Sequence, residues 1–532
     1  MGYTIGVVML VGFGCSGASN FGIAVCGSVE PGGQLDPQVA GTMVVAPDEK
    51  HVAFLRDPHT IEAGCISRGA QLELGTLVVL ELQSDGSACQ RVVADDVSSY
   101  SVFFSSDSQD LVFRDGVDHC GVGRLKAADS HGSNVRLVHG SVSSDVGIGS
   151  TVFFTVQDED YDLGAPIAGG KTISLGTHSE FGDPRYASNA TGTAFAYRKY
   201  GSDHGVADGS LVLIALPSGR SQTLVDGAAE ELGNRIWSPR GNWLAFCHGP
   251  KGAAELASLT LVAADGSTRI DVSTNSACYA FTFSPDDAWL VYPEIDSSGG
   301  TRLLTYSLKD RSSVALGVLP EGDFSLAFSD ESASVVATVD LTTSVTSPIY
   351  AGPAGTAGSL RVLVDTLAFP VGIVSAGGYV AVPNGNWTAV PTGYWTVGVY
   401  PVSGGAPVTI PGSDPLFEPG VPQPHLLLRQ YPPSAIAIAA TDGTAATTHA
   451  VPDFISFATW LGSAAVYGTA PDSSDLVTIS ALTSAGAVTT LLASEIGAYA
   501  WAPIPAPTRL FYSRTVATAG GPVGVSYADL PR

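Results

Sequence analysis

Basic residues are scarce in this sequence of 532 residues. Lysine and arginine together number 25 against 50 aspartates and glutamates, the formal net charge is −25, and no lysine follows Lys309. An acidic surface repels the phosphates of nucleic acids and the headgroups of anionic lipids, and no Lys/Arg run offsets it here. The sequence therefore excludes nucleic acid as an expected partner.

Local catalytic motifs are also missing. The sequence contains no G-x-S-x-G nucleophile elbow, no H-E-x-x-H zinc motif, and no P-loop or dinucleotide fingerprint after a strand. The ten histidines are scattered, and His119 beside Cys120 is interpreted as a chance pair in a turn. The carboxylate pairs at 95–96 and 286–287 are predicted to form turns, because adjacent turn residues make no acid–base couple without a surrounding cleft. We therefore predict no catalytic residue, although a site assembled from several repeats would leave no local motif.

The apolar run at the N-terminus, Ile5 to Gly14, is too short to cross a bilayer as a helix. It has the length of a signal-peptide core, and Cys15 with the small residues after it resembles the lipidation site of bacterial lipoproteins. The preceding residues carry no Lys or Arg, and Gly12 and Phe13 depart from the lipoprotein pattern, so an ordinary cleaved signal or a buried first strand stays open. We expect residues 1–20 to be an export signal with a short linker. The chain would then be periplasmic, extracellular or an outer-membrane lipoprotein that touches the membrane only through a lipid on Cys15.

Cysteines are few, and none has the C-x-x-C spacing of a zinc or thioredoxin-type site. Without Cys15 six remain, an even number that fits up to three disulfides in an oxidising compartment. Cys65 and Cys89 flank one predicted hairpin, and Cys247 and Cys278 sit in neighbouring repeats. These are therefore the preferred pairs, with free buried cysteines as the alternative.

Turn-forming and strand-forming residues are abundant instead. Gly (62) and Pro (33) are spread along the chain, and Val, Thr, Tyr and Phe cluster in short runs between them. Hydrophobic residues make up 45% and charged residues 14%, which is enough to build a large core. No segment has the pattern of an amphipathic helix, so the composition predicts an all-β fold.

One hairpin pattern recurs along the chain. Its clearest copies are IWSPRGNWLAF (Ile236 to Phe246) and FTFSPDDAWLVY (Phe281 to Tyr292), each with a polar turn between two apolar strands. Proline presets the turn, Asp, Asn or Gly tolerates the corner, and the flanking apolar residues bury one face. Weaker copies centre on Ala46, Ser105, Ser188, Ser329, Ser375, Glu418, Trp460 and Ala502. A degenerate copy around Gly147 fills a gap of double length, which gives about eleven units with a period of roughly 45 residues.

Each unit also has a second half, a third strand followed by a small turn and a short fourth strand, as in SLVLIALPSG and SQTLVDG. Four antiparallel strands form one blade of a β-propeller, and blades must stack around an axis because one blade cannot bury both its faces alone. One ring usually holds about four to eight blades. The sequence therefore predicts two tandem propellers, with about six blades over 21–325 and about five over 326–532. The last unit lacks one strand, which Phe21 to Val29 is expected to supply, bringing the two chain ends together.

The hairpin motif with its period resembles the propeller repeats of TolB-like periplasmic proteins, which are also WD-repeat-like. The same repeats occur in the propellers of prolyl-oligopeptidase relatives. The resemblance is strongest over Ile236 to Tyr292, is fair from Met43 to Asp340, and weakens from Leu341 onward. It implies that the motif locates a turn and carries no catalytic residue. By analogy alone it also implies a scaffold that binds partner proteins of the cell envelope.

An acidic segment is the sharpest local signal for a ligand. In QDEDYDLG, Asp158, Asp160 and Asp162 alternate, so a curled loop would turn three carboxylates toward one Ca²⁺, which prefers oxygen ligands. Leu163 stands where such a loop needs Gly, and Gly169 offers no bidentate carboxylate. A solvated acidic loop without any cofactor is therefore the alternative.

Two functions compete at this point. The first is a non-catalytic scaffold of the bacterial cell envelope that binds a protein or small ligand, with an acidic mouth or an aromatic one. Trp387, Tyr394 and Trp395 are the aromatic candidates, since they would stack on a sugar or peptide, although tryptophan also packs between blades. The second is a secreted glycan-active enzyme whose site is assembled across blades at the ring centre.

Overall fold

The fold is known from a computed structural model. It describes residues 25–28, 34–36, 40–62, 71–84, 87–156, 161–177, 179–180, 188–199, 210–216, 218–226, 229–250, 257–278, 280–296, 299–329, 332–340, 348–364, 374–376, 378–384, 396–411, 413–415, 425–430, 435–440, 442, 447–451, 454–461, 464–470, 477–483, 488–500, 507–514 and 524–530. These residues form strands and one short 3-10 helix, η1 (Ser99–Ser101), which confirms the all-β prediction. Within these ranges, no helix has the length and apolar character needed to span a membrane.

The described strands make up seven hydrogen-bonded sheets. The first sheet contains β1 (Val25–Ser28), β3 (Ala40–Val45), β4 (His51–Glu62), β5 (Gln71–Leu82), β6 (Ser87–Ser98), β7 (Phe103–Phe104), β8 (Asp110–Asp115), β9 (Gly123–Asp129), β10 (Arg136–Ile148), β11 (Thr151–Val156), β12 (Tyr161–Pro166) and β13 (Ile173–Thr177). The second contains β14 (Ser179–Glu180), β15 (Ala194–Lys199), β16 (Ser210–Ala215) and β17 (Arg220–Val225). The third contains β18 (Ala229–Trp237), β19 (Trp243–Pro250), β20 (Ala257–Ala263), β21 (Arg269–Ser276), β22 (Thr282–Phe283), β23 (Trp289–Ile295), β24 (Thr301–Ser307) and β25 (Ser312–Leu319).

The other four sheets lie in the second half of the chain. They contain β26 (Asp323–Phe328), β27 (Ser334–Asp340), β28 (Ile349–Pro353) and β29 (Arg361–Val364); then β30 (Val374–Ala376), β31 (Tyr379–Asn384), β32 (Thr396–Pro401) and β33 (Val408–Pro411); then β34 (Ser413–Pro415), β35 (Leu426–Gln430), β36 (Ala435–Ala439) and β37 (Thr447–Ala450). The last contains β38 (Phe454–Leu461), β39 (Ala464–Ala470), β40 (Val477–Thr483), β41 (Val488–Ala500), β42 (Arg509–Arg514), β43 (Gly524–Asp529) and β2 (Gln34–Asp36).

The expected hairpins fall on antiparallel strand pairs. The two clearest copies of the motif are the pairs β18–β19 and β22–β23. The degenerate copy is also a hairpin, because Gly147 lies opposite Val152 between β10 and β11. In the second half, where the turns lose their Ser-Pro-Asp character, Ser375 still lies opposite Val380 between β30 and β31. The apolar alternation alone therefore preserves the pairing.

Third and fourth strands complete the units. The order β14-β15-β16-β17 is antiparallel throughout, and the same order recurs in the sheets that begin at β26, β30 and β34. Four of the described strands serve two units each, and β6 and β21 do so by a single residue pair with β8 and β23. Strand β10 pairs with β9 through its first part and with β11 through its last part, and β41 does the same with β40 and β42. Such a strand leaves the outer edge of one unit and enters the inner position of the next, which merges neighbouring units into one large sheet.

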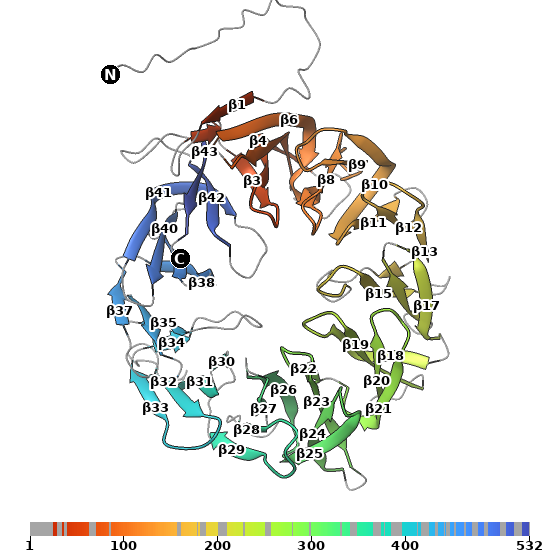
Figure 1. The fold of residues 1–532 in the computed structure, drawn as a ribbon, viewed down its shortest axis with the longest axis vertical. Helices are drawn as coiled ribbons and strands as arrows, with labels where there is room; N and C mark the ends of the chain where they lie inside the picture. Colours follow the sequence, from red (N-terminus) through yellow and green to blue (C-terminus); the bar gives the residue numbers. More distant parts are fainter. Residues whose placement is uncertain are drawn as a thin grey trace, which may run out of the picture.

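The sheets follow one another in chain order around one central opening (Figure 1). The two tandem rings expected from the repeat number are not confirmed. Leu316 and Leu319, before the expected boundary at 325/326, share one buried cluster with Phe328 and Val335 after it. Packing therefore continues across that boundary. The number of units in a ring depends on the angle between packed sheets, which the spacing of hairpins along the chain does not encode.

The two ends of the described chain meet. Strand β2 pairs antiparallel with β43, with Gln34 opposite Ser526. The N-terminal segment thus supplies the outer strand of the last unit, as expected, but the strand is Gln34–Asp36 rather than Phe21 to Val29. The reason is that β1, which lies inside that earlier segment, pairs with β6 instead.

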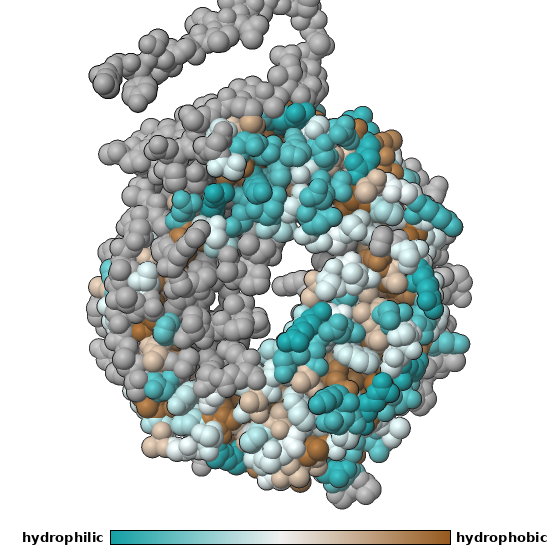
Figure 2. Space-filling model, viewed as in Figure 1, coloured by the Kyte–Doolittle hydropathy of each residue, from teal (hydrophilic) through white to brown (hydrophobic). Residues whose placement is uncertain are grey.

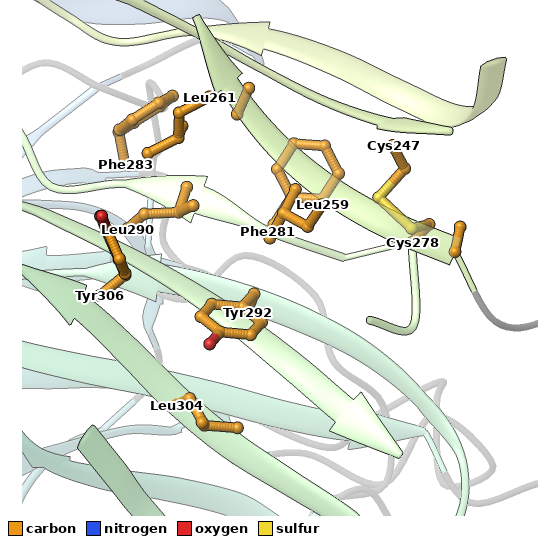
Figure 3. Packing of buried hydrophobic residues seen from close by; sticks show 12 residues of the cluster. Cys247, Leu259, Leu261, Cys278, Phe281, Phe283, Leu290, Tyr292, Leu304 and Tyr306 are labelled. Atoms are coloured by element: carbon orange, nitrogen blue, oxygen red, sulfur yellow. A yellow bond between two sulfur atoms is a disulfide. The ribbon is translucent and has the colours of Figure 1, made fainter. Parts of the chain in front are cut away.

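The core consists of apolar clusters buried within and between the sheets. In one of them Phe281 and Tyr292 pack near a disulfide between Cys247 and Cys278 (Figure 3). The Tyr292 hydroxyl lies 2.9 Å from the Ser313 hydroxyl, and burial raises the pKa of Tyr292 to about 12. Side chains from successive units interlock in this way around the ring, so apolar packing holds the units together.

Candidate functional site

The polar turn of one hairpin contacts the turn of the next unit. Asp287, in the β22–β23 turn, accepts hydrogen bonds from Ser238 Oγ (2.7 Å), Arg240 N (3.0 Å) and Asn242 Nδ2 (3.1 Å) in the β18–β19 turn. Its φ of 59° lies in the left-handed region, which aspartate tolerates better than most residues. The turn therefore does more than reverse its own chain, because it also joins two neighbouring units.

Contacts of this kind recur along the ring. They join Asp48 N to Ser108 Oγ (3.0 Å), Ser106 N to Gly149 O (3.2 Å), Asn189 Nδ2 to Gly241 O (2.9 Å) and Asp286 N to Ser332 Oγ (3.1 Å). At the junction of the chain ends, Glu49 accepts hydrogen bonds from Thr508 N (2.6 Å) and Thr508 Oγ1 (2.5 Å). We call the turns at 46–51, 105–110, 148–151, 189–194, 238–243 and 284–289, together with Ser329 and Ser332, the turn collar.

The paired carboxylates divide between two settings. The pair at 286–287 lies in a turn, as the sequence predicts. Burial tends to raise the pKa of Asp286, but hydrogen bonds from the Ser284 hydroxyl (2.6 Å) and Ala288 N (3.0 Å) outweigh it, and the pKa falls below its ordinary value. The pair at 95–96 lies on β6 instead, where Asp96 has a φ of 51°. The Asp-Asp pattern favours left-handed backbone without requiring the chain to reverse.

A buried ion pair joins the second unit to the third. The Asp145 carboxylate on β10 lies 3.7 Å from Arg114 Nε on β8 and accepts a hydrogen bond from Ser101 Oγ at 2.8 Å. Burial raises the pKa of Asp145 and lowers that of Arg114, and the opposite charge of the partner reduces each shift. The Asp145 side chain has no exposed surface, so a solvent-borne ligand cannot reach it. The pair is part of the packing between units.

The best candidate for a ligand site is a cluster of two histidines and a glutamate. His51 begins β4, Glu81 lies directly opposite it on β5, and His131 lies in the turn between β9 and β10 of the next unit. One ligand atom from each side chain lies within 4.8 Å of the other two. The His51 and His131 rings meet edge to face with their centroids 4.9 Å apart. The three side chains therefore converge at the junction of the first two units.

Hydrogen bonds orient each histidine of this cluster. His51 Nδ1 lies 2.9 Å from Asp48 Oδ2, and His131 Nδ1 lies 2.8 Å from Glu81 Oε2. Burial tends to raise the pKa of Glu81, but hydrogen bonds from His131 and Gln83 and the charges of both histidines outweigh it, so the pKa is lowered. Glu81 is therefore ionised at neutral pH and available as a metal ligand or hydrogen-bond acceptor.

This cluster was not predicted from the sequence. Its members are separated by 30 and 50 residues, so they form no local motif. The first two are brought together by the β4–β5 register, and the third by the packing of one unit on another. The available signal was that His51 follows the predicted turn centred on Ala46, whereas no prediction covered His131, so no distance between the two histidines could be predicted.

The predicted ligand residues fall mostly outside the described part of the chain. This holds for Cys15, Cys65, Asp158 and Asp160, and for the aromatic residues Trp387, Tyr394 and Trp395. Asp162 lies on β12, where its backbone pairs with Thr155. The lipidation site and the calcium site therefore stay predictions.

Four of the cysteines lie in disulfides. Cys247 and Cys278 are joined, as the preferred pairing has it, and Cys89 and Cys120 are each disulfide-bonded. The preferred partner of Cys89 was Cys65, which lies outside the described residues, so this pair stays a prediction. The register between β1 and β6 places Cys26 directly opposite Cys89.

Comparisons with known proteins give little further guidance. No family model matches the sequence, and no curated protein matches it either. Among solved structures, the chain is similar to one of two prolyl endopeptidases, with 14% identity and a TM-score of 0.33 over 63% of this chain and 54% of that one. It is similar to an oligogalacturonate lyase in complex with manganese, with 13% identity and a TM-score of 0.31 over 68% of this chain and 98% of that one. It is also similar to TolB from Acinetobacter baumannii, with 12% identity and a TM-score of 0.27 over 58% of this chain and 78% of that one. The chain spans about half the length of the prolyl endopeptidase that it matches. The propeller architecture therefore rests on the strand pairing and the ring arrangement described above.

Proposed function

We propose that this chain is a non-catalytic β-propeller scaffold of the bacterial cell envelope, with about eleven TolB-like repeats, that recognises a protein or a small ligand. The turn collar is the observation that carries the proposal. Its serines, aspartates and asparagines, the polar residues of the repeat, form hydrogen bonds to neighbouring turns. These residues thus hold the ring together, and the repeat itself is a structural device.

The shape and charge of the ring fit a binding role. Figure 2 shows that the central opening persists when side chains are drawn, and that hydrophilic residues gather over the part of the ring that contains β3 to β10. With a formal net charge of −25, the surface favours cationic or neutral partners over nucleic acid. A partner protein or ligand with basic groups would be steered to such a surface.

The location in the envelope is part of the same proposal. Cleavage before Cys15 and lipidation of its thiol would place the ring close to a membrane surface, since only nine residues lie between Cys15 and β1. An extended chain of this length spans about 30 Å. The disulfides at Cys89, Cys120, Cys247 and Cys278 support an oxidising compartment.

The experiment has two arms and uses the full chain expressed in a bacterium. In the first, the wild type and Cys15→Ser are fractionated and their mature N-termini are identified by mass spectrometry. We expect the wild type in the membrane fraction with a lipid on Cys15, and the variant in the soluble envelope fraction. An intact Met1 on the wild type would overturn the envelope assignment.

The second arm tests binding against catalysis. A photo-crosslinking residue replaces Asp107, on the exposed turn face, or Val318, on the outer strand β25. We expect the crosslinking residue on the turn face to give one discrete adduct, whose yield falls when the chain without that residue is added as a competitor. The residue on the outer strand should give no adduct. The purified chain should turn over neither oligosaccharides nor peptides. Saturable turnover of a glycan would instead support the enzyme with a site assembled across blades.

A further inference from the structure

The cluster of His51, Glu81 and His131 has the composition of a transition-metal site. Two imidazoles and one carboxylate are a common ligand set for Zn²⁺ and related dications, whereas Ca²⁺ and Mg²⁺ prefer oxygen ligands only. A tetrahedral ion with bonds of about 2.0–2.1 Å holds its ligand atoms roughly 3.3 Å apart. The ligand atoms here already lie within 4.8 Å of one another, so small rotations of exposed side chains complete the geometry.

His51 supplies independent support for a ligand. Its side chain is only 7% exposed, and Nε2 is buried without a hydrogen-bond partner. Because the Asp48 carboxylate accepts a hydrogen bond from Nδ1, the Nε2 atom is left with its lone pair free. A buried polar atom without a partner is costly, and a carboxylate behind the far nitrogen is the usual partner of a metal-bound histidine.

We propose that His51 Nε2, Glu81 and a ring nitrogen of His131 bind one Zn²⁺-type ion at the junction of the first two units. A neutral His131 ring binds the ion through the nitrogen that carries no proton; if that atom is Nδ1, its proton moves to Nε2, and Glu81 Oε2 exchanges its contact with His131 for a bond to the ion. The Glu81 and His131 side chains are 25% and 50% exposed, so the ion has an entry path and water can take the fourth position. Asp48 acts as a positioning residue for His51.

The site would fasten two units of the ring together. His51 and Glu81 belong to the β4–β5 pair, and His131 belongs to the β9–β10 turn. In addition to the apolar contacts, one ion therefore links backbone segments that belong to different sheet units. This role goes beyond partner recognition, because it needs no partner and acts within the chain.

Zinc titration of the metal-free full chain tests the proposal. The protein is stripped with a chelator, and Zn²⁺ affinity is measured by competition with a chromophoric chelator. We expect one equivalent to bind tightly, and His131→Ala and Glu81→Gln to weaken the affinity by at least about tenfold. His59→Ala is the matched control, because His59 is exposed on the same strand, β4, and should leave the affinity unchanged. Since His131 is half exposed, its replacement leaves the fold intact.

Two further readouts decide the outcome. Co²⁺ in place of Zn²⁺ should give the visible absorption of a four-coordinate site in the wild type and lose it in His131→Ala. Amide hydrogen exchange of β4, β5 and the β9–β10 turn should slow on addition of Zn²⁺ in the wild type and not in Glu81→Gln. Equal zinc affinity in His131→Ala and His59→Ala, or protection limited to other parts of the ring, would overturn the proposal.

Discussion

Single side chains in the turn collar connect units that lie far apart in the sequence. Asp287 receives its hydrogen bonds from residues 45 to 49 positions earlier, and Glu49 receives its bonds from Thr508. A hydrogen bond to a charged group contributes about 1.5–3 kcal/mol. A few of these residues therefore carry a measurable share of the stability that apolar packing provides to the ring.

Asp287→Gly tests this role of the collar. Glycine keeps the left-handed backbone at this position and removes all three accepted hydrogen bonds. We expect the free energy of unfolding to fall by about 2 kcal/mol, as measured by urea denaturation. Asp265→Gly is the control, because Asp265 bonds only within its own turn, and it should have a smaller effect. Equal stability of Asp287→Gly and the wild type would contradict the role.

The charge of Asp286 gives a pH-dependent prediction. Its pKa is lowered in the folded chain, so its contribution to stability is present above the ordinary aspartate pKa of about 4 and is lost as pH falls through the folded-state value. Asp286→Asn should thus unfold at lower urea than the wild type at pH 7, and the difference should shrink below pH 4. Urea titrations at pH 7, 5 and 3.5 measure this trend, which a constant difference would refute.

At the level of residues, sequence reasoning found the turn chemistry within a unit but not its partners. The Ser-Pro-Asp pattern around Asp287 predicts a tight corner, because proline and aspartate have local backbone preferences. Its bond to Ser238 depends on how two neighbouring units are placed against each other, and neither turn sequence encodes that distance. The same reason hid the contact of Glu81 with His131.

The strands and their pairing were the features of the fold that the sequence predicted best. Apolar residues that recur every second position on both sides of a turn predict a hairpin, and this held even for the weak copy at Gly147. What the pattern does not show is where one unit ends. The strands β10 and β41 each continue from one unit into the next, although Gly140 and Gly497 lie at the register shifts of these transitions.

The disulfide between β19 and the segment before β22 gives a prediction at this level. Cys247 and Cys278 are 31 residues apart in the sequence. Closing a loop of this length restricts the unfolded chain and stabilises the fold by about 3–4 kcal/mol. The double variant Cys247→Ala, Cys278→Ala should lose about that much in guanidinium unfolding without reductant. An unchanged unfolding midpoint would show that the bridge adds nothing.

At the scale of the whole molecule, the described sheets lie around one central opening, and the expected division into two rings is not confirmed (Figure 1). Eleven repeats suggested two rings because most rings hold fewer blades. Nothing in the sequence at 325/326 differs from other unit junctions, and Leu319 and Phe328 pack across it as the corresponding residues do elsewhere. The angle between neighbouring units sets how many units close the ring, and this angle depends on the volumes of many packed side chains.

Closure of the ring by β2 can be tested by truncation. A variant that lacks residues 1–38 removes the partner of β43 while keeping β3 and the Glu49 contacts. We expect faster amide hydrogen exchange in β42 and β43, and no change in β18 to β25 on the far side of the ring (Figure 1). Unaltered protection of β43 would show that the collar alone closes the ring.

The pairing of β2 with β43 also determines how late in synthesis the ring can close. Asp36 and its partner Val525 are about 490 residues apart, so at a ribosomal rate of about 5–20 residues per second β2 waits roughly 25–100 s for its partner to be made. During that interval the last unit has no outer strand, and both β2 and the growing edge can pair with other chains. A cell that makes this protein must keep the nascent β2 strand from pairing with other chains until the final residues arrive. Crossing a membrane unfolded, before any unit forms, would meet that requirement.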